Sequence, residues 1–294
     1  MPRLRCSNSQ LDKISSEGLP DAYIMTNLPL ERILFDRCLI GLGFSEACQQ
    51  ASEAFVEHFR DEFEALSDDI AELVILSKGL YYWMHNAVAV RLRRNLEANF
   101  IVTKRSSVSG RAVTIDVPYC DFSAPAHNLI IADTIASGAT MIAVLRHYFA
   151  FCPLRRVFMF SIAGSIEGGR SVAGFCRDHG IEFTLVYGLA AFGLAANGFD
   201  LSFLHPDTVC LKEEYIDRAR QVYEGNAVSA VGWDFGSQAQ ALHKYRMLCW
   251  IEAEYWGLQN SELFAVKEAV TDRRLVEKER AAYVQRVMLP DKCL

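Results

Sequence analysis

The chain has 294 residues, of which 51% are hydrophobic, and a formal net charge of −6. This length and apolar content are enough for a large core in one or two domains. Because the chain is acidic and has no basic tract, it is unlike proteins that bind the phosphate backbone of nucleic acids, and we expect no nucleic-acid partner.

The nine cysteines are scattered, with no Cys-x-x-Cys pair and no cysteine–histidine cluster at the spacing of a zinc site. Scattered thiols are typical of a reduced compartment, so we expect a cytoplasmic protein without a metal site built from its own side chains. No apolar run reaches the length of a membrane span, and the N-terminus lacks the apolar segment of a secretory signal. We therefore expect no membrane partner.

Helical periodicity comes first along the chain. Ser45 is predicted to cap an amphipathic helix over residues 45–66, with Ala47, Ala51 and Phe55 on its apolar face. The following residues predict a strand at 72–76, a helix at 81–95, a strand at 99–103 and a half-exposed strand at 111–118.

Strands and helices then alternate. The predicted order is a strand at 129–132, a helix at 141–148, a strand at 156–161, a helix at 167–179 and a strand at 182–187. This alternation predicts an α/β fold with a mostly parallel twisted sheet flanked by helices, preceded by N-terminal helices. Ligands of such sheets lie beyond the carboxyl ends of the strands, where we expect Ser77, Asp133 and Ser161.

Residues 129–140 carry the clearest chemical pattern, Leu-Ile-Ile-Ala-Asp-Thr-Ile-Ala-Ser-Gly-Ala-Thr. An apolar strand ends at Asp133, and small residues lead into the next helix. Backbone N–H groups and the helix dipole favour a phosphate at a helix N-terminus. The loop lacks the spacing of a Walker loop and the three glycines of a dinucleotide fingerprint. The pattern indicates a sugar phosphate, with Asp133 on ribose hydroxyls and the loop on the 5′-phosphate.

This segment resembles the phosphoribosyl-pyrophosphate (PRPP) loop of type I phosphoribosyltransferases, most of all the uracil phosphoribosyltransferase branch. That branch has Asp-Pro-Met-Leu-Ala-Thr-Gly-Gly-Thr, one residue longer. Further matches follow the same order at Val74 to Leu80, Ile101 to Arg105 and Ser161 to Gly168, so the resemblance covers roughly residues 45–205. It implies an enzyme that transfers 5-phosphoribosyl from PRPP to a small-molecule acceptor and releases pyrophosphate, with Mg²⁺ held mainly through PRPP.

The resemblance also implies roles for individual residues. The pyrophosphate-loop arginine of the family falls on Ser77, so Lys78, followed by Gly79, is expected to supply the positive charge there. The strand-end arginine falls on Arg105. Asp133, Lys78 and Arg105 are the expected catalytic residues, the first on ribose and the other two on the leaving pyrophosphate. The 5′-phosphate is expected on Ala136, Ser137, Gly138, Ala139 and Thr140.

The acceptor segment departs from the uracil branch. That branch binds its base with the backbone of a Tyr-Ile-x-Pro-Gly-Leu-Gly-Asp-Ala-Gly-Asp segment, whereas residues 199–208 here lack the glycines. A site that hydrogen-bonds one polar ligand rejects a mismatched one strongly. We therefore expect an acceptor other than plain uracil, in contact with Phe199, Asp200 and Asp207. The general base is left open among Asp200, Asp207, Tyr187 and His205.

Residues 211–294 have no counterpart in the family pattern. They are predicted to form a helical extension packed on a domain of residues 1–210, with Gly232 to Gly236 breaking two helices and Ser237 capping the second. The extension is rich in aromatic residues. These either close the acceptor pocket or form helix contacts and a dimer surface, and we expect a homodimer.

Other functions stay open at this point. A PRPP-sensing regulator without catalysis would fit the loss of the arginine at Ser77, and a uracil salvage enzyme would fit the branch that the loop resembles. A hydrolytic or binding protein on a related scaffold is a further alternative, because fold does not fix function. The retained Lys78, Gly79 and Arg105 favour an enzyme that handles pyrophosphate.

Overall fold

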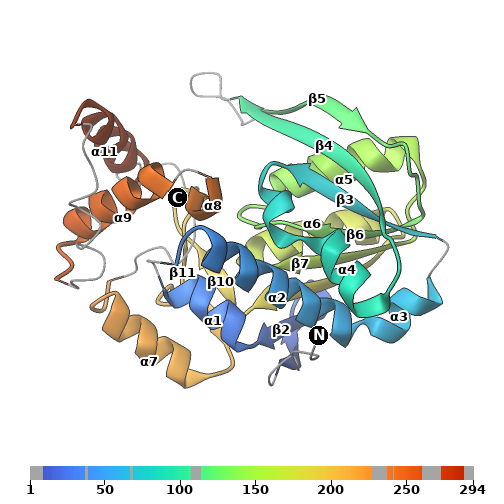
Figure 1. Cartoon of the computed structure of the whole chain (residues 1–294), viewed down its shortest axis with the longest axis horizontal. Helices are drawn as coiled ribbons and strands as arrows, with labels where there is room; N and C mark the ends of the chain where they lie inside the picture. Colours follow the sequence, from blue (N-terminus) through green and yellow to red (C-terminus); the bar gives the residue numbers. More distant parts are fainter. Residues whose placement is uncertain are drawn as a thin grey trace.

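An eight-stranded sheet lies at the centre of the protein, with helices on both of its faces (Figure 1). The computed structural model describes residues 9–36, 39–66, 69–106, 114–226, 237–240, 242–259 and 273–287. The strand order across the sheet is β1-β2-β9-β7-β6-β3-β4-β5. These strands are β1 (Gln10–Ser16), β2 (Leu19–Thr26), β3 (Ile70–Leu76), β4 (Glu97–Ser106), β5 (Thr114–Asp121), β6 (Asn128–Ala132), β7 (Arg156–Ser161) and β9 (Glu182–Gly188).

The sheet is mostly parallel. The six inner strands, β2-β9-β7-β6-β3-β4 in their order across the sheet, pair parallel with one another. The edge strands β1 and β5 pair antiparallel with β2 and β4. Inner strands of such a sheet are apolar throughout because helices cover both faces, and every residue of β6 is buried. The predicted α/β class with a mostly parallel sheet flanked by helices is confirmed.

Each face of the sheet has its own hydrophobic cluster. On one face, α5 (Ala139–Phe151) and α6 (Ile166–Asp178) bury Val144 and Val172 against the strands. The opposite face is covered by α1 (Leu28–Phe35), α2 (Leu42–His58), α3 (Arg60–Ala65) and α4 (Met84–Leu92). There Phe55 of α2 stacks on Phe160 of β7, with ring centroids 5.1 Å apart.

The expected N-terminal helices are present, but an unpredicted hairpin, β1–β2, precedes them. Strand β2 joins the sheet beside β9, with Ala22 opposite Leu185. Local sequence patterns cannot predict this pairing, because the partner strand is more than 150 residues away. Strand β1 is largely exposed and lies at the sheet edge, so it lacks a strong apolar pattern.

Two helix predictions need correction. The helix predicted for residues 45–66 is split at Phe59 into α2 and α3, and it begins at Leu42. Ser45 is therefore not the N-cap; its backbone N–H donates to the Gly41 carbonyl inside the first turn. The helix predicted for residues 81–95 is a short 3₁₀ helix, η1 (Lys78–Tyr82), followed by α4. Trp83, with φ of 53°, separates the two.

A second, small sheet lies after β9. It consists of β8 (Gly164–Ser165), β10 (Ala190–Leu194), β11 (Leu201–Ser202) and β12 (Val209–Cys210). Strand β10 pairs with β8 just after the carboxyl end of β7. The segment predicted to contact the acceptor, residues 199–208, lies in and around β11. The small sheet therefore positions that segment near the carboxyl edge of the large one.

The C-terminal part is helical, as expected. It consists of α7 (Glu213–Val222), α8 (Ser237–Gln240), α9 (Leu242–Trp256) and α11 (Arg273–Val287). Tyr223, Cys249 and Leu258 belong to the same cluster as α1 and α2. The predicted break at Gly232 to Gly236 and the side chain of Ser237 lie outside the described residues. Among the described helices, none is both long and apolar enough to span a bilayer.

Candidate functional site

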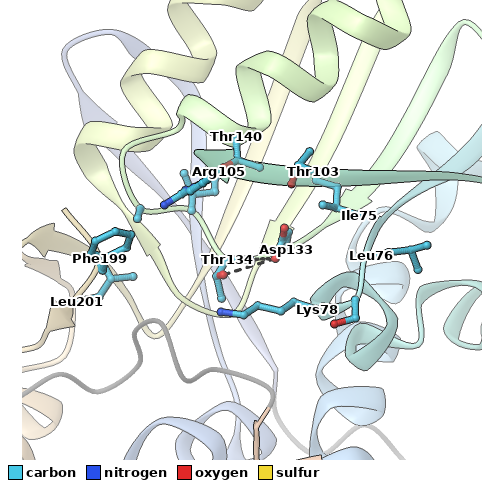
Figure 2. A pocket seen from close by; sticks show the side chains of 13 residues that line it. Ile75, Leu76, Lys78, Thr103, Arg105, Asp133, Thr134, Thr140, Phe199 and Leu201 are labelled. Carbon is cyan, nitrogen blue, oxygen red and sulfur yellow. Dashed lines mark hydrogen bonds between the residues drawn. The ribbon is translucent and has the colours of Figure 1, made fainter. Parts of the chain in front are cut away.

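One cavity of about 410 Å³ lies at the carboxyl edge of the large sheet (Figure 2). The ends of β3 and β4, the β6–α5 loop and the β10–β11 connection all contribute to it. Its lining residues are Ile75, Leu76, Ser77, Lys78, Thr103, Arg105, Asp133, Thr134, Ile135, Ala136, Thr140, Phe199 and Leu201. Segments that are far apart in the chain therefore bring predicted site residues into one space.

Asp133 stands at the end of β6, where its backbone N–H donates to the Phe160 carbonyl of β7 at 3.2 Å. Its carboxylate accepts from the Thr134 backbone N–H at 2.7 Å. The side chain is 9% exposed. Burial raises the pKa of Asp133 to about 6, although the positive charges of Lys78 and Arg105 act in the opposite direction. The Asp133 carboxyl group therefore loses its proton just below neutral pH.

Residues 163–168 hold the loop after Asp133 in place. The Ile135 N–H donates to the Ala163 carbonyl at 3.2 Å, and the Ser165 N–H donates to the Ile135 carbonyl at 2.8 Å. The Ser165 hydroxyl also donates to the Ala136 carbonyl. Backbone groups of this strand-end turn and the Ser165 hydroxyl thus hold residues 134–138, called the phosphate loop after its predicted role, in shape.

The loop ends at the N-terminus of α5. Gly138 is the N-cap residue with φ of +79°, and no side chain caps the helix. The first N–H groups of α5 therefore keep their capacity to bind an anion. Thr140 lines the cavity within this first turn, whereas Ser137, Gly138 and Ala139, also predicted to hold the 5′-phosphate, are not among the described lining residues.

The β3 end supplies Ser77 and Lys78. The peptide between Leu76 and Ser77 is cis. Gly79 does not line the cavity; a Cβ there would lie 3.3 Å from the Ala132 carbonyl oxygen, so glycine allows η1 to pack against the end of β6. In the view of Figure 2, Asp133 lies between Lys78 and Arg105.

Arg105 extends from β4 toward the phosphate loop. Its Nε and Nη2 donate to Thr140 Oγ1 at 3.0 and 2.8 Å. The guanidinium carbon lies 5.6 Å from the centroid of the Phe199 ring. The sequence-based expectation assigned Arg105 to pyrophosphate; the structure brings it to a residue expected to bind the 5′-phosphate.

The three candidate acceptor residues are not together. Phe199 lines the cavity, but Asp200 is buried and accepts from the Asn197 side chain at 2.7 Å. Asp207 instead lines a different cavity, of about 460 Å³, together with Glu167 and Arg170. Contact of Asp200 and Asp207 with an acceptor stays a prediction.

The remaining candidates for the general base also lie outside the cavity lining. Tyr187 is buried, and its hydroxyl donates to the Ser165 carbonyl at 3.2 Å; burial raises its pKa far above the ordinary range. His205 packs against Gly193 and accepts from the Asp207 backbone N–H at 3.2 Å. These contacts of Tyr187 and His205 do not identify either residue as the general base.

Six lining residues were not among the sequence-predicted site residues: Ile75, Leu76, Thr103, Thr134, Ile135 and Leu201. Thr103 had a usable signal, because it is two residues before Arg105 on β4 and alternate residues of a strand share a face. The described lining residues all precede residue 202, so none comes from the C-terminal extension.

The expectation that Mg²⁺ is held mainly through PRPP stays a prediction. Among the described residues, no three histidine, cysteine, aspartate or glutamate side chains form a group that would hold a metal ion. Among the lining residues that the structure describes, Asp133 is the one carboxylate. One carboxylate beside phosphate oxygens is a donor set that Mg²⁺ accepts when the substrate supplies the rest.

Comparisons with known proteins give distant structural likenesses alone. No family model and no curated protein matches the sequence. Among solved structures, the chain is similar to adenine phosphoribosyltransferase from Trypanosoma brucei, with 15% identity, 61% of this chain and 87% of that chain covered, and a TM-score of 0.38. The chain is also similar to hypoxanthine phosphoribosyltransferase from Staphylococcus aureus, with 10% identity, 52% of this chain and 78% of that chain covered, and a TM-score of 0.35. For orotate phosphoribosyltransferase from Aeropyrum pernix, the identity is 13%, the coverage is 54% of this chain and 93% of that chain, and the TM-score is 0.33. These values are too low to assign the chain to a family.

Proposed function

We propose that this protein is a phosphoribosyltransferase that transfers 5-phosphoribosyl from PRPP to an acceptor other than plain uracil. One observation carries the proposal: Lys78, Arg105, Asp133 and Thr140, each selected from the sequence for PRPP, line the same cavity. They come from β3, β4 and the β6–α5 loop, which meet at the edge where parallel sheets bind ligands.

The charges of the cavity suit PRPP. Its described lining residues include two cationic side chains, Lys78 and Arg105, and one anionic side chain, Asp133. PRPP has an anionic group at each end and hydroxyls between them. The cations and the N-terminus of α5 suit the two phosphate ends, and Asp133 suits the ribose hydroxyls as a hydrogen-bond acceptor.

In the proposed reaction, the bond between C1 of ribose and pyrophosphate breaks, and pyrophosphate leaves with the electron pair. A nucleophilic atom of the acceptor forms the new bond to C1 and loses its proton. Lys78 stabilises the charge that develops on pyrophosphate, and Asp133 orients the ribose. Mg²⁺ bound to PRPP would neutralise part of the phosphate charge.

The acceptor side supports a substrate unlike uracil. Phe199 and Leu201 give this wall of the cavity an apolar aromatic surface, and residues 199–208 lack the glycines that would bring backbone groups to a pyrimidine edge. Ligand pockets commonly combine such apolar walls with a few polar groups. An acceptor with a ring larger or less polar than uracil fits these walls.

Calorimetry with PRPP and Mg²⁺ is the first test, followed by pyrophosphate release with a panel of nucleobases, aromatic acids and aminocyclitols. We expect PRPP to bind, and we expect uracil to react with kcat/KM below about 10⁴ M⁻¹s⁻¹, the lower end of the usual enzyme range. Faster formation of uridine monophosphate would favour the uracil salvage enzyme. PRPP binding without any acceptor would favour the regulator, and absence of PRPP binding would overturn the proposal.

The proposal includes a cytoplasmic homodimer. Light scattering of the purified protein measures the dimer, and a monomer at the concentrations used in the assay would remove that part of the proposal.

A further inference from the structure

Arg105 connects two walls of the cavity that lie in different parts of the chain. Its guanidinium donates two hydrogen bonds to Thr140 Oγ1, at 3.0 and 2.8 Å, and lies over the Phe199 ring (Figure 2). Thr140 belongs to the first turn of α5, and Phe199 follows β10. One side chain of β4 thus contacts both the phosphate loop and the acceptor side.

The contact with Thr140 leaves hydrogen-bond capacity for an anion. A guanidinium has five N–H donors, and two of them serve Thr140. Thr140 Oγ1 accepts from Arg105, and its hydroxyl also has a hydrogen to donate. The first N–H groups of α5 lie beside it with no side-chain cap. Charged, hydroxyl and backbone donors therefore converge on the start of α5.

The second cation of the cavity is on a different side. Lys78 extends from η1 after β3, and Figure 2 shows its amine near Thr134, away from Thr140. Two separated cations suit the two anionic ends of one substrate. The arginine beside the helix N-terminus matches the end that the phosphate loop holds.

We propose that Arg105, together with Thr140, binds the 5′-phosphate of the phosphoribosyl substrate and links that group to Phe199 on the acceptor wall. The inference rests on the proposed function. It moves Arg105 from the leaving pyrophosphate, where the family resemblance placed it, to the opposite end of PRPP, and it leaves Lys78 at the pyrophosphate.

The link to Phe199 follows from the same geometry. A phosphate that takes up guanidinium N–H groups fixes the position of the guanidinium, and the ring lies 5.6 Å from it. The Phe199 ring is 37% exposed and lines the cavity, so its environment changes when the guanidinium is fixed. Binding of the 5′-phosphate end therefore prepares the surface that meets the acceptor.

The test separates the two ends of PRPP by using ribose 5-phosphate and pyrophosphate as probes in calorimetry with Mg²⁺. Arg105→Ala is expected to weaken ribose 5-phosphate binding by about 10- to 100-fold, as for a lost charge-assisted hydrogen bond, and to leave pyrophosphate binding within about twofold. Arg105→Lys keeps the positive charge but loses the paired N–H donors of the guanidinium. Its affinity for ribose 5-phosphate is expected to lie between those of the wild type and Arg105→Ala.

Arg146→Ala is the matched control. Arg146 is an exposed arginine on α5 that lies over a phenylalanine ring, Phe175, at 5.8 Å, outside the cavity. Its removal deletes the same charge and the same kind of ring contact, and we expect no change in either affinity. The Phe199→Trp variant adds a spectroscopic readout, because its emission is expected to shift with ribose 5-phosphate and not to shift when Arg105→Ala is combined with it.

The outcomes are distinct. Loss of pyrophosphate binding with intact ribose 5-phosphate binding in Arg105→Ala would return Arg105 to the leaving group and overturn the inference. Equal losses of ribose 5-phosphate affinity in Arg105→Ala and Arg146→Ala would mean that the effect comes from the overall charge of the protein. That result would also overturn the inference. Failure of the wild-type protein to bind PRPP would overturn the proposed function, and the inference with it.

Discussion

Gly138 and Gly168 meet backbone to backbone beneath the phosphate loop. A Cβ on Gly138 would lie 2.7 Å from the Gly168 carbonyl oxygen, and φ of Gly138 is +79°. Both the close approach and the left-handed conformation require glycine at position 138. The loop and the first turn of α6 thus fix each other.

Substitution at Gly138 is expected to abolish PRPP binding. Gly138→Ala adds the clash to the cost of a positive φ, about 1–2 kcal/mol, and Gly138→Val adds more bulk. Calorimetry with PRPP and urea unfolding measure the two effects. Gly180→Ala is the control, because Gly180 also has a positive φ, +67°, but open space around its Cβ position. Equal PRPP affinity in Gly138→Val and wild type would contradict the structure of the loop.

Asp133→Asn is expected to lose PRPP affinity while the protein stays folded, because the amide keeps the shape but not the charge that accepts ribose hydroxyls. Calorimetry with PRPP and Mg²⁺ measures the loss, and we expect at least about tenfold. Wild-type affinity in this variant would remove Asp133 from the substrate site.

The same variant is expected to change how stability depends on pH. The pKa of Asp133 is about 6 in the folded protein, against an ordinary aspartate value of 3.8 in the unfolded chain. A raised carboxyl pKa favours the folded state at acid pH, and this contribution is lost as the pH rises from about 4 to about 6. Asp133→Asn avoids the loss, so it should be more stable than wild type by up to ~3 kcal/mol near neutral pH.

Urea unfolding of both proteins between about pH 4 and pH 7 measures this difference. The two stabilities should converge at the acid end and separate toward neutral pH. A difference that stays constant over the range would mean that burial does not raise the pKa of Asp133.

Ser165→Ala is expected to loosen the phosphate loop as well as α6. The hydroxyl accepts from the Gly168 N–H at 2.7 Å as the N-cap of α6, and it donates to the Ala136 carbonyl. Loss of an N-cap costs about 1 kcal/mol, and the half-buried Ala136 carbonyl also loses its hydroxyl donor. Ser171→Ala, on the same helix, removes a hydroxyl that donates to the Glu167 carbonyl of its own helix. Thermal unfolding and PRPP affinity should fall in the first variant and stay near wild type in the second.

Lys78→Met is expected to weaken pyrophosphate binding by about 10- to 100-fold, because a charge-assisted contact is lost. It should also raise the pKa of Asp133 further, since Lys78 is the larger of the two positive influences on that carboxyl. Lys212→Met, which removes a lysine beside Tyr215 far from this cavity lining, is the control. If ribose 5-phosphate binding fell as much as pyrophosphate binding, Lys78 would not belong to the leaving-group end.

The sequence by itself predicted the α/β class, which the fold confirms, and it placed the β6–α5 loop between a strand and a helix. An apolar strand, Asp133, small residues and a helix are local features, and each follows from sterics and periodicity within a few residues. The predicted residues Lys78, Arg105 and Thr140 fell into one cavity because strand order in parallel sheets brings carboxyl ends together.

Only the tertiary structure decided which distant groups meet. The pairing of Ala22 with Leu185, the Ser165 bond to Ala136 and the position of Arg105 over Phe199 all join segments widely separated in sequence. Hydrophobic periodicity encodes which face of an element is buried, but not which partner covers it. That choice depends on the packing of the whole core, which is why the contacts of Arg105 with Thr140 and Phe199 could be seen only in the fold.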